Sequence, residues 1–238
     1  MRCAILSDIH ANLEALETVI SHAKALQVDR WVVLGDSIGY GANPNECLDW
    51  VFEHADQRVT GNHEAAVVDP QIRSWFNPAA RASSKWTEKT LSERLKAKIL
   101  DIPWVAAEGD AVFVHGSLDE PEAFHYLFTF DDAAGTFRKM QTAVCFVGHT
   151  HLPGCICEGE RTAKLLPPGL LALKEGERYI LNPGSVGQPR DADPRSAYGI
   201  YDSMQRTFEI FRLPYDNIKT ADKIRKAGLP RSLADRLL

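Results

Sequence analysis

Short runs of mostly apolar, β-branched or aromatic residues recur along the chain, and polar residues follow each of them at once. The first five runs span residues 3–6, 31–34, 57–60, 111–114 and 143–147. Runs of this length and composition are typical of buried β-strands. Apolar residues at helical spacing separate several of the runs, and this alternation indicates an α/β fold.

The helical segments carry recognisable start signals. Asn12 is predicted to cap a helix between the first two strands, which makes residues 1–34 a βαβ unit. Asn43, followed by Pro44, is predicted to cap a second crossover helix. The segment 70–100 is predicted to form a helical insertion near the cleft, where aromatic residues at helical spacing favour core positions over a cleft wall.

The last third of the chain has a different pattern. Extended runs at 179–181, 197–201 and 207–211 alternate with turn residues, which predicts a mostly antiparallel second sheet packed on the first. Residues 216–238 are predicted to form a helical tail broken at 228–230. The sequence leaves open whether this tail is a dimer element or a lid. With no linker or repeat along its length, the chain 1–238 is predicted to be a single domain.

Five polar clusters directly follow the first five strands. They are Asp8-Ile9-His10, Gly35-Asp36, Gly61-Asn62-His63-Glu64, His115 and Gly148-His149-Thr150-His151. Ligands of open α/β folds bind beyond the carboxyl ends of the strands, so all five clusters are expected to meet in one cleft. A single cluster of this kind is weak evidence because short motifs match by chance, but five at successive strand ends predict a metal site.

The candidate metal ligands combine imidazole and oxygen donors and include no thiolate. They are Asp8, His10, Asp36, Asn62, His115, His149 and His151. Such a set suits Mn, Fe, Zn, Co or Ni better than Mg or Ca alone. Seven donors are too many for one tetrahedral ion, so they predict two divalent transition metal ions sharing a bridging carboxylate, typically about 3.5–4 Å apart.

In these motifs and their order, the chain resembles the calcineurin-like metallophosphoesterase superfamily, whose pattern is D-x-H, G-D, G-N-H-[DE], H and G-H-x-H. The resemblance implies a four-layered α/β/β/α sandwich of two mixed sheets. It also implies two metal sites bridged by Asp36. The first would use Asp8, His10, Asp36 and His151, and the second Asp36, Asn62, His115 and His149.

The resemblance further implies hydrolysis of a phosphoester by a metal-bridging hydroxide, without a side-chain nucleophile. It assigns His63, at the outer edge of the site, to protonation of the leaving group. An ordinary histidine pKa near 6.5 suits that role. The alternative is that His63 only hydrogen-bonds a neighbour. Glu64 is expected to be structural and to steer a ligand imidazole.

The chain departs from the protein phosphatase branch after Gly35-Asp36. That branch continues with an Asp and an Arg that clamps phosphate, whereas here Ser37-Ile38-Gly39-Tyr40-Gly41 follows. The Gly-Tyr-Gly element and the segment 182–187 resemble the small bacterial and archaeal phosphodiesterase branch. Asn62 and Arg190 are the predicted substrate contacts, although Arg190 fits a solvated surface arginine equally well.

The preferred interpretation is therefore a small-molecule phosphodiesterase. A phosphomonoesterase or nucleotide pyrophosphatase is the alternative, and a non-catalytic scaffold is a distant one. The net charge of −5 argues against extended nucleic acid as a partner. With neither a signal peptide nor an apolar span, the protein is expected to be cytoplasmic with no membrane partner. A homo-oligomer is possible, and Cys155 and Cys157 fit strand positions better than half of a zinc site.

Overall fold

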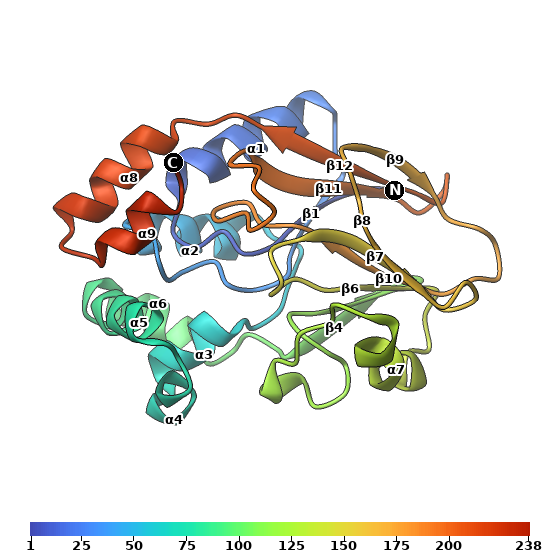
Figure 1. Ribbon diagram of the computed structural model, residues 1–238, viewed down its shortest axis with the longest axis horizontal. Coiled ribbons are helices and arrows are strands. Elements are labelled where there is room, and N and C mark those ends of the chain that lie inside the picture. Colours follow the sequence, from blue (N-terminus) through green and yellow to red (C-terminus); the bar gives the residue numbers. More distant parts are fainter.

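The computed structural model describes residues 1–238 and contains two six-stranded sheets (Figure 1). Sheet A has the order β3-β2-β1-β11-β12-β9, and sheet B has the order β4-β5-β6-β10-β7-β8. The strands of sheet A are β1 (Arg2–Leu6), β2 (Arg30–Val33), β3 (Gln57–Arg58), β9 (Gly169–Ala172), β11 (Ser196–Asp202) and β12 (Thr207–Leu213). The strands of sheet B are β4 (Val105–Glu108), β5 (Ala111–Val114), β6 (Val144–Phe146), β7 (Pro153–Cys157), β8 (Thr162–Leu165) and β10 (Tyr179–Pro183).

Nine α-helices and one 3₁₀ turn flank the sheets. They are α1 (Leu13–Ala25), α2 (Pro44–His54), α3 (Asn62–Val68), α4 (Pro70–Ser74), α5 (Pro78–Thr90), α6 (Glu93–Ile99), η1 (Pro121–Ala123), α7 (Phe130–Lys139), α8 (Asn217–Lys226) and α9 (Arg231–Asp235). None of these helices is long and apolar enough to cross a membrane.

Alternating side chains of the strands build three apolar layers. Ile5 and Leu34 of sheet A pack against Phe113, Phe146 and Leu181 of sheet B in the layer between the sheets. On the outer face of sheet A, Ala4 and Leu6 of β1 and Tyr198 and Ile200 of β11 pack against α1 and α2. On the outer face of sheet B, the alternate residues of β5 and β6 pack against α7. The expected four-layered sandwich of two mixed sheets is therefore confirmed.

The first βαβ unit forms as predicted, with Asn12 capping its helix. The predicted cap of the second helix, Asn43, does not form. Strands β1 and β2 are parallel, and Asn12 Oδ1 accepts the Ala15 backbone N–H at 3.2 Å at the start of α1. Asn43 precedes α2 but makes no side-chain capping bond. Its side chain instead donates to Glu46 Oε1 and accepts from Lys223 Nζ, each at 2.9 Å, because the C-terminal tail lies against it.

The prediction that the late strands form their own sheet is wrong. Strand β10 lies in sheet B beside β6 and β7, whereas β11 and β12 extend sheet A. The reason is that β2 pairs with only one edge of β1, and the other edge needs a partner for its backbone groups. Strand β11 provides it in antiparallel register, with Arg2 opposite Asp202.

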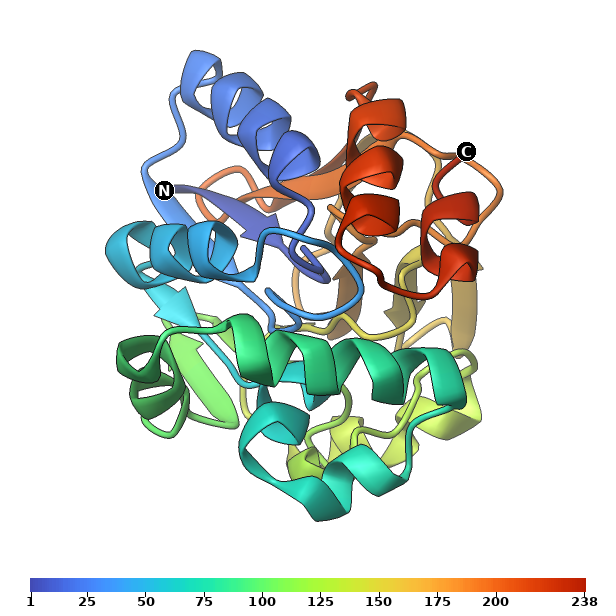
Figure 2. The ribbon, with the colours of Figure 1, turned by 90° about the vertical axis from the view of Figure 1, so that its left-hand side faces the viewer.

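Helices gather at the end of the sandwich where β1 terminates. Helices α3 to α6 lie on one side of this end and α8 and α9 on the other, as Figures 1 and 2 show. Trp75 of this helical region is 65% exposed, so the prediction of a core position fails there. Its neighbour Phe76 points inward and contacts the ring of His63, with centroids 4.8 Å apart.

Candidate metal centre and active site

The loops that leave β1, β2, β3, β5 and β6 bring all seven predicted metal ligands together. The residues are Asp8 and His10 after β1, Asp36 after β2, Asn62 after β3, His115 after β5, and His149 and His151 after β6. All of them are buried. Two groups of three side chains within this set have the mutual spacing of metal ligands, and a third such group includes His63.

The first group consists of Asp8, His10 and His151. His151 Nε2 lies 3.2 Å from Asp8 Oδ1 and 3.1 Å from His10 Nε2. His10 Nε2 lies 3.7 Å from Asp36 Oδ2. Asp8, His10 and His151 therefore converge, and Asp36, the fourth residue that the resemblance implies for the first ion, lies beside His10.

The second group consists of Asp36, His115 and His149. His115 Nε2 lies 3.4 Å from Asp36 Oδ2, 3.2 Å from His149 Nδ1 and 3.1 Å from Asn62 Oδ1. The same oxygen of Asp36 faces both groups, because His10 of the first group also approaches Oδ2. Asp36 thus lies between the two groups of candidate ligands.

Backbone carbonyl groups orient three of the imidazoles. The carbonyl oxygens of Ile38, Leu34 and Gln188 accept from the Nδ1 atoms of His10, His115 and His151, at 3.1, 2.6 and 2.5 Å respectively. A hydrogen on Nδ1 leaves the Nε2 lone pair free for a metal ion, so these contacts select the ligating tautomer. Sequence patterns could not reveal them because every acceptor is backbone.

The donor set fits divalent transition metal ions. Asp8 Oδ1 is buried without a hydrogen-bond partner, although buried carboxylate oxygens normally have one. The Nε2 atoms of His10 and His151 face one another at 3.1 Å although both rings carry their hydrogen on the far side. Converging lone pairs and an unpartnered carboxylate oxygen are satisfied together by a cation, and nitrogen with oxygen donors suits Mn, Fe, Zn, Co or Ni.

The charges of Asp36 and His115 depend on each other. Burial alone raises the pKa of Asp36, but the imidazoles of His115 and His63 outweigh burial and hold that pKa well below its usual value. Burial lowers the pKa of His115, whereas the Asp36 carboxylate outweighs it and raises that pKa to about 9. Asp36 is therefore an anion that demands a positive partner in the buried site.

The expectation for His63 is wrong in one respect. Its side chain lies inside the site with 2% of its surface exposed, and burial lowers its pKa to about 4. Its Nδ1 has no hydrogen-bond partner, which argues against the alternative that His63 only bonds a neighbour through this atom. Its spacing to His10 and Asp36 is also that of a metal ligand, so position alone allows two roles.

Glu64 has a different role from the expected one. Its carboxylate contacts no ligand imidazole and instead accepts the backbone N–H groups of Asp36, Ser37 and Gly61 at 2.8, 2.6 and 3.1 Å. Burial raises the pKa of Glu64 to about 7. This residue is structural, as predicted, but it holds the backbone of two ligand loops rather than a side chain.

Strained backbone marks the site independently of side-chain chemistry. Five of the seven predicted ligands have left-handed φ values between 50° and 65°, namely Asp8, His10, Asp36, His149 and His151. Residues other than glycine rarely adopt this region, and each costs of order 1–3 kcal/mol. Such strain persists where surrounding contacts fix the backbone, and clusters of it are typical of functional sites.

The mouth of the site contains residues that the sequence did not single out. A cavity of about 590 Å³ is lined by Tyr40, Asn77, Tyr126, Pro189, Arg190, Ala192 and Arg236. The Tyr40 ring packs against both His10 and His63, with centroid distances of 4.5 and 4.4 Å. The Tyr126 ring stacks on His149 at 3.9 Å. Arg190 therefore lies at the mouth of the site.

The five cysteines, including Cys155 and Cys157, are buried, form no disulfide and lie away from the site.

Comparison with known proteins agrees with this geometry. Residues 1–205 match the model of the calcineurin-like phosphoesterase superfamily domain. An uncharacterised protein of Methanocaldococcus jannaschii, MJ0912, is 37% identical over 98% of this chain and 96% of its own length. The phosphodiesterase YfcE of Escherichia coli K12 is 27% identical over 85% of this chain and 88% of its own. The crystal structure of a metallophosphoesterase from Sphaerobacter thermophilus superposes with a TM-score of 0.90 and 40% identity, covering 100% of this chain and 98% of that one.

Proposed function

The chain belongs to the calcineurin-like phosphoesterase superfamily and is a metal-dependent phosphoesterase, and we propose that it preferentially hydrolyses a small phosphodiester with two metal ions. The observation that carries the proposal is the position of Asp36. Its Oδ2 lies 3.7 Å from His10 Nε2 and 3.4 Å from His115 Nε2, so one carboxylate serves two ligand groups. A single-ion enzyme has no need of the second group.

In this proposal, Asp8, His10, Asp36 and His151 hold one ion, and Asp36, Asn62, His115 and His149 hold the other. When bound, two such ions lower the pKa of a water molecule and polarise a phosphoryl oxygen. The protein keeps the donors in place through the three carbonyl contacts to the imidazoles and through the Glu64 contacts to the loop backbone. Asn62, whose Oδ1 lies 3.1 Å from His115 Nε2, would offer its amide to the second ion and to the substrate.

His63 is the proposed proton donor to the leaving group. The rings of Tyr40 and Phe76 flank its imidazole and limit its direction, while its backbone N–H donates to Asp36 Oδ1 at 2.8 Å. Burial lowers the pKa of His63 to about 4, so the imidazole is neutral at pH 7 in the free protein, and in this proposal the anionic substrate raises that pKa so that the ring carries the proton. Phosphoester cleavage benefits most from such a donor when the leaving group is a poor one.

Two features favour a diester substrate. Tyr40 presents a neutral aromatic ring beside His10 and His63, in the loop where the protein phosphatase branch has its clamping arginine. A monoanionic diester asks for less positive charge than a dianionic monoester, so the site needs no such clamp. The 27% identical YfcE of E. coli is described as a phosphodiesterase, which agrees with this preference.

One observation favours the alternative, a phosphomonoesterase or nucleotide pyrophosphatase. Arg190 lines the mouth of the site, and its Nε is buried without a hydrogen-bond partner. A guanidinium there can bind a terminal phosphate through paired hydrogen bonds. The substrate is in either case a small molecule.

The test compares bis-p-nitrophenyl phosphate with p-nitrophenyl phosphate. Chelator-treated protein is expected to be inactive and to regain activity best with Mn, Co or Ni, with kcat/KM for the diester at least equal to that for the monoester. The Asp36→Asn protein, purified identically, controls for a contaminating phosphatase. A strong monoester preference that disappears in Arg190→Ala would support the alternative, and full activity after metal removal would refute both.

A further inference from the structure

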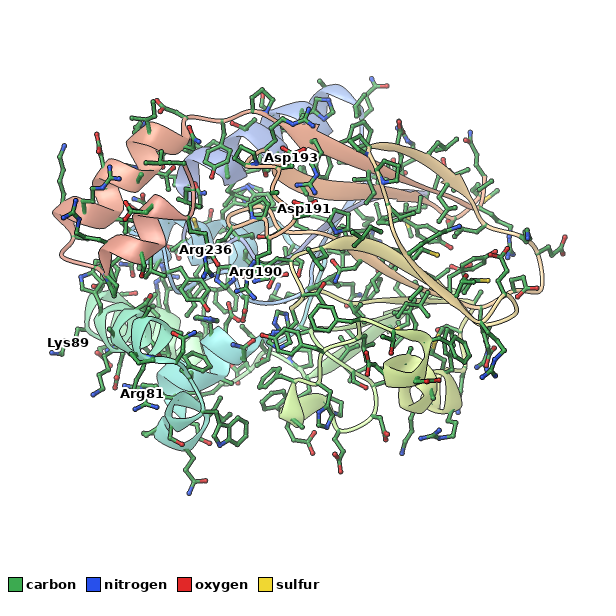
Figure 3. All side chains as sticks on the ribbon, viewed as in Figure 1. Arg81, Lys89, Arg190, Asp191, Asp193 and Arg236 are labelled. Carbon is green, nitrogen blue, oxygen red and sulfur yellow. The ribbon has the colours of Figure 1, made fainter.

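Two arginines from distant parts of the chain lie side by side at the mouth of the site. Arg190 follows β10 and Arg236 ends α9 in the C-terminal tail, and Figure 3 shows them next to each other. Arg190 Nη2 and Arg236 Nη1 each lie 3.4 Å from the same atom, Gln188 Oε1. The two guanidinium nitrogens are therefore at most twice that distance apart.

Neither guanidinium has a carboxylate partner. The acidic residues nearest in sequence to Arg190 are engaged elsewhere, because Asp191 pairs with Arg212 and Asp193 pairs with Arg195 at 2.7 Å. No acidic residue lines the 590 Å³ cavity into which both arginines project. The one neutral oxygen that they share is at the outer limit of hydrogen-bond length, so it contributes little to either.

This arrangement is unfavourable without a further partner. Two like charges repel, and because Arg190 is half-buried while Arg236 is exposed, water screens this repulsion only in part. Arg190 Nε is in addition a buried donor with no acceptor, which is uncommon in proteins. An anion in the cavity would offset the repulsion and satisfy the donor, and phosphate oxygens match the planar fork of guanidinium groups.

The arginine pair is coupled to the metal centre through Gln188. The backbone carbonyl of Gln188 accepts from His151 Nδ1 at 2.5 Å, while its side chain contacts both arginines. Tyr40 lines the same cavity and contacts His10 and His63. A ligand bound by the arginines is thus adjacent to the metal-binding residues.

We infer that Arg190 and Arg236 form a subsite for a second phosphate group, so that the substrate is a small phosphoester carrying another phosphate besides the one cleaved. The inference rests on the proposed function and narrows it. Arg190 alone could bind the phosphate of any phosphoester. The pair of arginines adds two positive charges to those of the proposed metal ions, which is more than a monoanionic diester needs. Arg236 is a specificity-determining residue in this scheme.

Calorimetric binding to the metal-loaded protein tests the subsite directly, with thymidine 3′,5′-bisphosphate and thymidine 5′-monophosphate as probes. Charged hydrogen bonds of this kind predict that the bisphosphate binds about ten- to a hundredfold more tightly. Arg236→Gln and Arg190→Gln should each remove most of this ratio. Arg231→Gln is the matched control, since Arg231 is exposed on the same helix and lines no part of the cavity, and it should keep the ratio.

Equal affinity for the two probes, or the same ratio in Arg236→Gln as in the parent, would overturn the inference. A loss of the affinity ratio in Arg231→Gln equal to that in Arg236→Gln would also overturn it, because the ratio would then reflect the net charge of the protein and not a specific subsite. The p-nitrophenyl esters of thymidine 5′-phosphate with and without a 3′-phosphate then separate the two proposals. If neither ester is hydrolysed while the binding ratio holds, the diesterase assignment fails and the subsite stands.

Discussion

Individual residues at this site are held in positions that few substitutions tolerate. Gly39 has a φ of +85°, and a Cβ built on it would lie 2.1 Å from His63 Nδ1. The direction of the His63 ring therefore depends on a residue that lacks a side chain. The backbone of the strained ligand Asp36 is likewise held from outside, because its N–H donates to Glu64 Oε2. The positions of the reactive side chains therefore depend on the local backbone conformation as well as on side-chain contacts.

The role of His63 can be separated from that of a metal ligand. If it donates a proton, His63→Asn should retain both ions and lose roughly 10²–10⁴-fold in kcat for alkyl or ribose leaving groups. The loss should shrink for p-nitrophenolate, which needs little protonation. Metal content by mass spectrometry and kcat across a series of leaving groups measure the two properties.

His149→Asn serves as the comparison, since it removes a predicted ligand and should lower the metal content. If His63→Asn also loses an ion, its spacing to His10 and Asp36 reflects ligation instead. A loss of equal size for every leaving group would assign His63 to substrate positioning.

At the scale of elements, the C-terminal tail is fastened to the first helix by charge. Glu14 Oε1 of α1 forms ion pairs with Lys223 Nζ at 2.6 Å and Lys219 Nζ at 3.1 Å, both on α8. Burial raises the pKa of Glu14, but the two lysines outweigh burial and lower it overall. Because α9 and Arg236 follow α8 directly, this contact also positions one wall of the site mouth.

This ion pair should make stability depend on pH. A lowered pKa in the folded state means that Glu14 stabilises the protein above its unfolded pKa of about 4.3, and that this contribution is lost as pH falls through the folded value. Glu14→Gln should therefore lower the free energy of unfolding by on the order of 1 kcal/mol at pH 7 and by much less near pH 3. Urea unfolding at the two pH values measures it. Glu17→Gln, at an exposed position of the same helix, should have little effect, and a pH-independent loss in Glu14→Gln would rule out the ionic origin.

The elements differ in how far the sequence could predict them. The strands that end in metal ligands were predictable, because compact apolar runs stop abruptly at donor residues. Three of the four edge strands, β4, β8 and β9, were missed. The side chains of β8 and β9 are largely exposed and two prolines separate these strands, so no alternation marks them. Sheet membership was predicted wrongly because pairing of β1 with β11 leaves no local signal. Arg236 was missed for the same reason, since only the folding back of the tail brings it to Gln188.

At the scale of the whole molecule, the metal centre joins the two sheets. Asp8, Asp36 and Asn62 follow strands of sheet A, whereas His115, His149 and His151 follow strands of sheet B. Metal ions held by both sets would therefore connect the two halves of the sandwich.

Metal binding should consequently stabilise the fold. An ion present at a hundred times its dissociation constant contributes about 2.7 kcal/mol. For a chain of this size, that predicts a rise in Tm of roughly 5–10 °C when Mn²⁺ is added to chelator-treated protein. Scanning calorimetry measures the shift, which should be smaller in Asp36→Asn than in Asp8→Asn because Asp36 serves both ions. An unchanged Tm in the parent protein, or equal shifts in the two variants, would contradict the bridging arrangement.

The pairing of Arg2 with Asp202 has a further consequence for how the protein acquires its structure. Strand β1 leaves the ribosome early, yet one of its edges gains a partner only after β11 has been synthesised. Contacts between such distant residues slow folding, because a long loop must close before they form. Until then, β1 exposes unpaired backbone groups that can pair with other chains. Nascent chains that stall before residue 202 are therefore the species of this protein most prone to aggregation, whatever the stability of the finished sandwich.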